Sequence, residues 1–391
     1  MGLHLQWQHR RGPGEAWMDT GQDPAIRRRT GCLRGERREI ATVPRLAHHP
    51  REQAMRAATH SAGTRLRQVG FTLVELLVAL ALTLLIVTAA VATLIVSRRG
   101  FSTVDAVSQL DENARFTTEI LRRTIAQAGF LDVAFATGTT AGQFKLAKAA
   151  AALPMVHGYN DAQMPDPPDV EPFSVNGNRS SCPGTAGTAC KNGSDVLIVR
   201  AQAAARNANE ADGVTTNCRG SAESTVPTDA SDVITSIFFV RVDTNTGEPT
   251  LMCHANGTNS KGQNRFSTVP LVSGVESFQV LYGVDGVDPG KAMIPANSVV
   301  DRYLRADQLD VPGDAAASLA NWQRVRAIKI GLLLRSPANS AQESSATTRY
   351  PFGVGGYSSA ADPGTALAVP ADGRLRQTVS FTVYLHNPQV H

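Results

Sequence analysis

The fold is decided by residues 71–96, which read FTLVELLVALALTLLIVTAAVATLIV and carry Glu75 as their only charged side chain. As a helix, residues 76–96 would extend about 30 Å, which is enough to cross the hydrocarbon core of a bilayer. A secretory signal peptide would have a shorter apolar run that ends in a small-residue cleavage site. The sequence therefore predicts a transmembrane segment at residues 71–98.

The residues after this segment keep a helical pattern, because apolar side chains recur at steps of three and four and only the polar Thr117 interrupts them. The apolar positions are Phe101, Val104, Val107, Leu110, Ala114, Leu121, Ile125 and Ala128. No proline separates this stripe from the span, and Gly100 alone only weakens the junction. We therefore expect one helix over residues 71–128, about 85 Å long, with an amphipathic half at residues 99–129 and Gly129 as its C-cap.

Beyond the helix, several short runs have the composition of β-strands. They are residues 195–200, 233–242, 250–253, 275–282, 325–334 and 379–385. Several of them alternate apolar and polar side chains, which is typical of an antiparallel sheet with one face packed on a helix. Residues 134–165, rich in Ala, Gly, Thr and Pro, indicate a linker. The predicted fold class is α+β, with a head at residues 130–391.

The charges place the two ends of the chain on opposite sides of a membrane. Residues 1–70 hold 13 Lys/Arg against 6 Asp/Glu, whereas the rest holds 25 against 28. Arg56, Arg65 and Arg67 precede the span, so the positive-inside rule puts that end in the cytoplasm and the head across the membrane. The slightly acidic remainder shows no basic face for nucleic acid. Residues 1–54 lack apolar periodicity, and Met55 is a simpler start for a short basic leader that ends at residue 70.

Four cysteines, Cys182, Cys190, Cys218 and Cys253, follow the span, while Cys32 lies in the N-terminal extension. In an oxidising compartment an even number of cysteines indicates two disulfides, with three pairings open in principle. The favoured pairing joins neighbours along the chain, Cys182 with Cys190 and Cys218 with Cys253. Zinc is the alternative, but no C-x-x-C pair supports it.

One motif at the start of the span carries functional information. Gly70, Phe71 and Glu75, preceded by a basic leader and followed by an uninterrupted apolar helix, closely resemble the class III signal of type IV pilins and type II secretion pseudopilins. The resemblance implies cleavage after Gly70 by prepilin peptidase and methylation of the new Phe71 amine. Glycine suits a scissile site because its backbone adopts extended or unusual geometry and can approach a protease closely.

Glu75 is the residue that a plain anchor does not explain, since a carboxylate in a bilayer-facing helix costs about 2.5–3.5 kcal/mol. The resemblance implies that in the filament this carboxylate pairs with the charged Phe71 amine of a neighbouring subunit. Two alternatives remain. The carboxylate could snorkel to the headgroup level from its place near the helix end, or the whole span could be a generic anchor.

Four further segments, residues 111–130, 271–285, 321–336 and 374–387, are similar to the PilW family of type IV pilus minor pilins. This resemblance implies a minor pilin that primes the pilus and sits at or near its tip, supporting adhesion and twitching motility. Its implied partners are other minor pilins, the major pilin, prepilin peptidase, the inner-membrane assembly platform and a tip adhesin. The chain departs from the family at Leu131 and Asp132, where the family often has Gly-Cys, so one customary cysteine is missing here.

Other signals are weak, and the sequence predicts neither an enzyme nor a cofactor. His157, His254, His386 and His391 are dispersed and lack metal-ligand spacing. Asp285 and Asp288 could offer oxygen ligands to calcium, but without the EF-hand pattern a plain turn is favoured. Trp322 precedes a predicted strand and is expected to be a packing residue.

Two other functions stay open. A type II secretion pseudopilin shares the cleavage motif and would serve a different machine. A membrane-tethered periplasmic binding module would use the head to hold a ligand.

Overall fold

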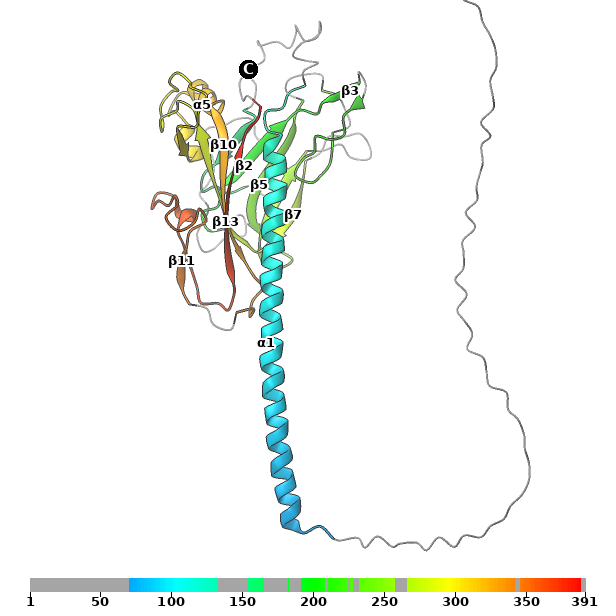
Figure 1. Ribbon diagram of the computed structural model, residues 1–391. Helices are drawn as coiled ribbons and strands as arrows, with labels where there is room; N and C mark the ends of the chain where they lie inside the picture. Colours follow the sequence, from blue (N-terminus) through cyan, green and yellow to red (C-terminus); the bar gives the residue numbers. More distant parts are fainter. Residues whose placement is uncertain are drawn as a thin grey trace, which may run out of the picture. The chain divides into compact units, whose positions relative to one another are not determined.

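The chain divides into two units, Met1–Gly70 and Phe71–His391. The structure, a computed structural model, describes residues 70–132, 154–164, 182, 191–207, 210–223, 226–227, 232–256, 266–341 and 345–387. All statements below concern these residues (Figure 1).

The longest element is helix α1, Leu73–Ala126, whose 54 residues extend about 81 Å. It begins at the N-cap Thr72, whose hydroxyl accepts a hydrogen bond from the Glu75 backbone N–H at 3.2 Å. After the C-cap Gln127, Gly129 has a φ of +73°, the left-handed geometry that ends helices and favours glycine. The predicted single helix through Gly100 is thus present, and its ends lie within two residues of the expected ones.

The head contains two larger antiparallel sheets instead of the single sheet predicted from the strand pattern. The five-stranded sheet has the order β1 (Val156–Tyr159), β2 (Val196–Ala201), β5 (Ile234–Val242), β6 (Pro249–Ala255) and β7 (Ser267–Ser273). The four-stranded sheet has the order β13 (Arg376–Tyr384), β10 (Val325–Arg335), β8 (Val275–Val284) and β9 (Arg302–Leu304). All six predicted strands are present with shifted ends. The predicted linker at 134–165 is wrong at its end, because β1 pairs there with β2.

Smaller elements complete the head. Two short hairpins pair β3 (Ala205–Asn207) with β4 (Glu210–Ala211) and β11 (Thr347–Arg349) with β12 (Leu367–Val369). The helical turns are α4 (Ala306–Leu309), α5 (Ala315–Trp322) and η3 (Pro363–Thr365). Trp322 ends α5 and is buried against the ring edges of His157 and Tyr282, so it is the packing residue that the sequence predicted.

Gly274 is the point where the chain passes from one sheet to the other. It lies between β7 and β8 with a φ of +84°, and a Cβ atom there would lie 2.5 Å from the Arg335 carbonyl oxygen. Its N–H donates to the Pro249 carbonyl at 2.8 Å, and its carbonyl accepts from the Arg335 N–H at 2.7 Å. Only glycine fits this position, since it tolerates both the dihedral angle and the close approach.

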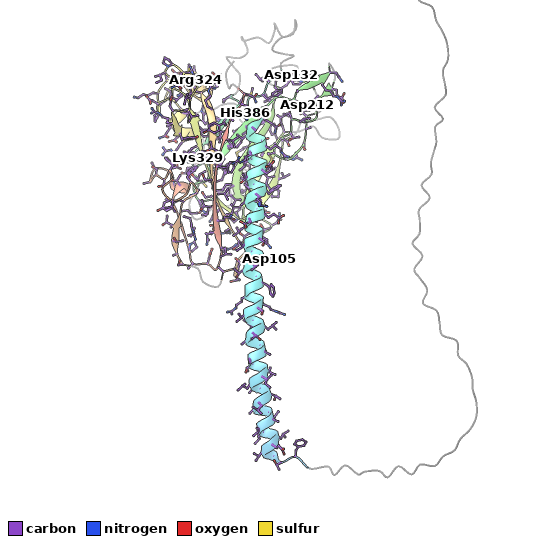
Figure 2. All side chains as sticks on the ribbon, in the orientation of Figure 1. Asp105, Asp132, Asp212, Arg324, Lys329 and His386 are labelled. Carbon is purple, nitrogen blue, oxygen red and sulfur yellow. A yellow bond between two sulfur atoms is a disulfide. The ribbon has the colours of Figure 1, made fainter. Side chains whose placement is uncertain are left out.

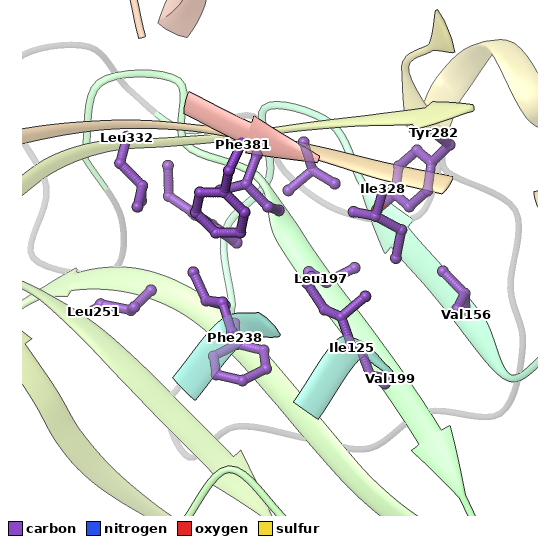
Figure 3. Packing of buried hydrophobic residues seen from close by; sticks show 14 of the residues in the cluster. Ile125, Val156, Leu197, Val199, Phe238, Leu251, Tyr282, Ile328, Leu332 and Phe381 are labelled. Atoms are coloured by element: carbon purple, nitrogen blue, oxygen red, sulfur yellow. The ribbon is translucent and has the colours of Figure 1, made fainter. Parts of the chain in front are cut away.

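The core lies where the C-terminal half of α1 meets both sheets (Figure 3). Leu121 and Ile125 of α1 are fully buried in one cluster with Phe238 and Leu251 of the five-stranded sheet and with Ile328, Leu332 and Phe381 of the four-stranded sheet. The helix therefore holds the two sheets together.

The face of α1 that packs on the head differs from the predicted stripe. Phe101, Val104 and Val107 were expected on it, but all three are exposed, and burial begins at Ala106. Thr117 does not interrupt the stripe, because its hydroxyl donates to the Asn113 carbonyl at 2.6 Å and the residue is fully buried. The apolar side chains do recur with a helical period, but the first of them face away from the head.

The end of α1 is fixed to the head without the cysteine that the family often has there. Asp132, labelled in Figure 2, is buried, and its carboxylate accepts a hydrogen bond from the Ala205 N–H at 2.7 Å. Its own N–H donates to the side-chain oxygen of Gln202 at 3.1 Å. At this position the buried carboxylate of Asp132 therefore connects the end of α1 to β3 by a hydrogen bond.

A disulfide joins Cys218 to Cys253 of β6, with their Cα atoms 6.0 Å apart. Both residues are fully buried in the main core. Cys182 is also disulfide-bonded, and Cys190, its expected partner, lies outside the described residues.

Replacing both Cys218 and Cys253 by alanine should lower the free energy of unfolding by about 4 kcal/mol, because the bond closes a loop of 35 residues in the unfolded chain. Urea unfolding of the full chain in detergent measures this loss. The single Cys182→Ala variant, which removes the disulfide of Cys182 and leaves Cys218–Cys253 intact, serves as the comparison. An unchanged urea midpoint in the double variant would contradict the prediction.

Candidate assembly segment

The N-terminal half of α1 is apolar and makes almost no contact with the head. Every described residue from 70 to 102 is exposed, and in Figure 2 the lower part of α1 extends beyond the head with side chains on all its sides. α1 is the one described helix that is long and apolar enough to cross a membrane, and none of its most apolar window is buried. So much exposed apolar surface marks a membrane or protein contact.

The first turn brings together the residues singled out by the sequence. Gly70 and Phe71 precede the helix in an exposed stretch, and the Phe71 side chain is 84 % exposed. Glu75 lies in the first helical turn, also exposed, one turn above the N-cap Thr72. In the described part of the chain its carboxylate has no cation partner.

The threonine hydroxyls inside the apolar segment are satisfied by the helix itself. The hydroxyls of Thr83 and Thr88 donate to the carbonyls of Leu80 and Leu85, both at 2.9 Å. The Thr93 hydroxyl donates to the Ala90 carbonyl at 2.8 Å. Because these hydroxyls need no water, the segment can enter a lipid or protein environment without unpaired donors.

The apolar surface of α1 continues above the predicted span, on the side that the head leaves open. Phe101 is 77 % exposed and Phe116 is 51 % exposed, although both lie on the amphipathic half. Sequence periodicity identified Phe101 as apolar but could not tell which surface it contacts. Phe116 falls outside the predicted stripe, so the stripe alone could not find it.

The calcium candidates do not form a cation site. The buried carboxylate of Asp285 accepts hydrogen bonds from the backbone N–H groups of Asn297 (2.9 Å) and Ser298 (3.0 Å). Asp288 instead forms an ion pair with Arg302 at 2.6 Å. Among the described residues no three His, Cys, Asp or Glu side chains converge as metal ligands. Asp285 therefore fixes the loop between β8 and β9 by accepting these backbone hydrogen bonds.

The histidines are separate as well. His157 is buried beside Trp322, and His254 of β6 contacts the Thr268 hydroxyl through Nδ1 at 2.9 Å. His386 is exposed, and His391 lies outside the described residues.

Comparison with known proteins gives two family matches. The prokaryotic N-terminal methylation motif matches residues 65–91, a range that includes Gly70, Phe71 and Glu75. The type IV pilus-assembly protein W (PilW) family matches residues 237–387, which lie in the head from β5 to the end of β13. The chain is similar to the PilW family of type IV pilus minor pilins.

The resemblance drawn from the sequence is thereby confirmed, and three of its four segments, those in the head, lie inside the PilW match. PilW is a family of structural pilins and not an enzyme family. Among solved structures, a type IV-like pilin from Thermus thermophilus is 15 % identical, with a TM-score of 0.31, and the comparison covers 72 % of this chain and 98 % of that one. Among curated proteins none matches.

Proposed function

We propose that the chain is a minor pilin of the type IV pilus that acts in the complex priming pilus assembly and takes a position at or near the tip, supporting adhesion and twitching motility. The observation that carries this proposal is the exposed apolar segment that begins at Phe71, directly after Gly70, and continues as the first half of α1, with Glu75 as its single carboxylate in the first helical turn. The PilW match in the head favours the pilus over a type II secretion pseudopilin.

In this proposal residues 1–70 are a leader, over-extended at its start, that prepilin peptidase removes. Residues 71–98 then anchor the subunit in the inner membrane, with a cytoplasmic N-terminus and a periplasmic head at residues 130–391. Residues 99–129 connect the two parts. On assembly the subunit leaves the bilayer for an extracellular filament, and the same apolar surface packs against neighbouring subunits.

The filament supplies what an isolated helix lacks, namely a partner for Glu75. The methylated Phe71 amine of a neighbouring subunit would neutralise the carboxylate, so both charges leave the lipid together. Above the span, Phe101, Val104 and Phe116 remain exposed beside the head and extend the surface available to other pilins. The head is large for a repeating shaft subunit, which agrees with a low-copy or tip position.

Gly70→Ala tests the proposal, because it should abolish processing and leave the leader attached. Intact-mass spectrometry of the wild-type protein should show a chain that begins with N-methylated Phe71, whereas the variant should retain the leader and should not enter pili. A Cβ atom at Gly70 meets no atom within 4 Å, so the substitution does not disturb packing.

Gly100→Ala is the matched control, since Gly100 lies 30 positions further along the same exposed segment and also has open space around a Cβ atom. It should be processed and incorporated normally. A wild-type protein that still begins upstream of Gly70 in piliated cells would refute the proposal. Such a result would favour the tethered binding module instead.

A further inference from the structure

A cavity lies where α1 leaves its apolar segment and meets the lower edge of the head. It has a volume of about 390 Å³ and is lined by Arg98, Arg99, Ser102, Thr103 and the loop residues 339–341. No acidic residue lines it. In the described part of the chain neither arginine forms an ion pair. The nearest acidic residue along the helix, Asp105, accepts a hydrogen bond from Gln109 at 2.9 Å.

The loop side of the cavity is firmly built. The Thr103 hydroxyl donates to the Ser340 carbonyl at 3.0 Å and so ties the loop to α1. The Ser340 hydroxyl donates to the Pro337 carbonyl at 2.8 Å and also contacts the Ser336 hydroxyl. The Ala341 N–H donates to the Gly373 carbonyl at 2.9 Å. The position of this loop over the two arginines is therefore part of the fold.

Asn339 has a φ of +61°, a left-handed conformation that non-glycine residues seldom adopt. Its side chain is exposed, and the residue lines the cavity. Asparagine tolerates this geometry better than most residues and offers two amide donors. The cavity thus combines two guanidinium groups with hydroxyl and amide donors, a set suited to an anion with several oxygen atoms.

The height of the cavity on the helix indicates which anion it meets. Arg98 follows Glu75 by 23 positions, or about 35 Å along the axis, while the hydrocarbon core is about 30 Å thick. With Glu75 at one face of the bilayer, Arg98 and Arg99 lie in the headgroup layer of the other face. The oxygen-rich anion concentrated in that layer is the phosphate of phospholipids.

The geometry points to a binding site for the headgroup of an anionic phospholipid, formed by Arg98, Arg99, Ser102 and Asn339, which holds the subunit in the membrane before assembly. This inference rests on the membrane-anchored state proposed above. The arginines would contact the phosphate oxygens, and the loop at 339–341 would cover the headgroup from the side of the head. Entry into a filament would then require release of this lipid.

The test is binding of phosphatidylglycerol to the full chain in detergent, titrated by native mass spectrometry. Arg98→Gln combined with Arg99→Gln should weaken binding roughly 30-fold, since each arginine near anionic lipid contributes about fivefold. Asn339→Gly keeps the left-handed backbone and removes the amide, so it should weaken binding about fivefold.

Arg115→Gln combined with Arg123→Gln is the matched control, because it removes the same charge from exposed positions on the same helix. Arg115 lies about 25 Å above Arg98, well beyond the Debye length of about 8 Å in physiological salt, so binding should change less than twofold. An equal loss in both double variants would show that only net charge matters and would overturn the inference.

Two further arms identify the ligand and its dependence on the membrane. Excess inorganic phosphate should not displace phosphatidylglycerol, and displacement at similar concentrations would show a site for free phosphate instead. Carbonate extraction of cell membranes should leave the chain in the membrane fraction. Release by carbonate would overturn both this inference and the proposed anchor, whereas retention without a preference for phosphatidylglycerol would overturn this inference alone.

Discussion

Replacing Glu75 by alanine is expected to leave cleavage after Gly70 intact and to lower incorporation into filaments by roughly tenfold to a hundredfold. A carboxylate at the centre of a bilayer-spanning helix costs about 2.5–3.5 kcal/mol, so the cost for Glu75 near the helix end stays below this value, and in the proposal a neighbouring Phe71 amine compensates it only in the filament. Without Glu75, that amine enters the filament core unpaired, which is strongly unfavourable. A loss of about 1.4–2.8 kcal/mol corresponds to the expected range.

The measurement is the ratio of the subunit in sheared pili to the subunit in membranes, determined by immunoblot. Misfolding should not confuse it, because the Glu75 side chain is exposed and the N-cap uses the backbone N–H of residue 75, which alanine retains. Glu75→Gln should behave like Glu75→Ala if charge is what matters. Normal incorporation of both variants would remove the electrostatic explanation.

Glu112→Ala provides the control for loss of a carboxylate from the same helix. Glu112 is exposed on the amphipathic half, about 55 Å along the helix from Glu75. At that distance it cannot meet the terminal amine that Glu75 is proposed to meet. Its replacement should leave both processing and incorporation unchanged.

The long helix could be predicted because its signals are local. An apolar run without proline, a stripe at steps of three and four, and Gly129 at the end are all visible in consecutive residues. The direction of the stripe could not be predicted, because Phe101 and Val104 have the same period as Leu110 and Leu121. Periodicity reports that a face is covered and does not say whether the head or another molecule covers it.

The division of the head into two sheets depends on contacts between distant residues. At Gly274 the chain passes from one sheet to the other and packs closely on the carbonyl of Arg335, which is 61 positions away. No pattern in neighbouring residues indicates this contact. Strand β7 carries Pro270, which suits an edge strand but masks the strand pattern. Strand β1 has four residues in an Ala- and Pro-rich region and becomes a strand only by pairing with β2.

The candidate site shows the same division. Gly70, Phe71 and Glu75 lie within six consecutive residues, so the sequence alone could single them out as a motif. The cavity at Arg98 and Arg99 was not, because its other wall comes from residues 339–341, more than 230 positions later. At Asp285 the sequence favoured a plain turn over calcium, but the backbone hydrogen bonds of its carboxylate span 12 and 13 positions, which a pattern of acidic residues does not reveal.

A buried ionic network joins the two sheets near Gly274. Glu276 of β8 lies between Arg376 (2.7 Å) and Arg335 (3.0 Å), and its side chain is 5 % exposed. Arg335 also pairs with Glu248 at 2.7 Å, just before β6. Arg376 pairs in turn with Asp372 at 2.7 Å. The network thus connects β6 of one sheet with β8, β10 and β13 of the other.

Glu276→Ala is expected to lower the free energy of unfolding by about 3–5 kcal/mol, because it leaves two largely buried arginines without their shared carboxylate. Urea unfolding of the full chain in detergent, followed by near-UV circular dichroism of the head, measures the change. Asp288→Ala is the matched control, since it breaks an ion pair whose side chains are 37 % and 48 % exposed. That loss should stay below about 1 kcal/mol.

A second substitution distinguishes two causes of the stability loss in Glu276→Ala, namely unpaired arginine charge and lost side-chain packing. Arg376→Met in the Glu276→Ala background removes one of the stranded cations while keeping an apolar side chain of similar length. If unpaired charge dominates, this second substitution should restore part of the stability, although it removes a further partner of Asp372. If the double variant is less stable than Glu276→Ala by the full cost of Arg376→Met alone, the carboxylate acts through packing, and the network is not what holds the two sheets together at this edge.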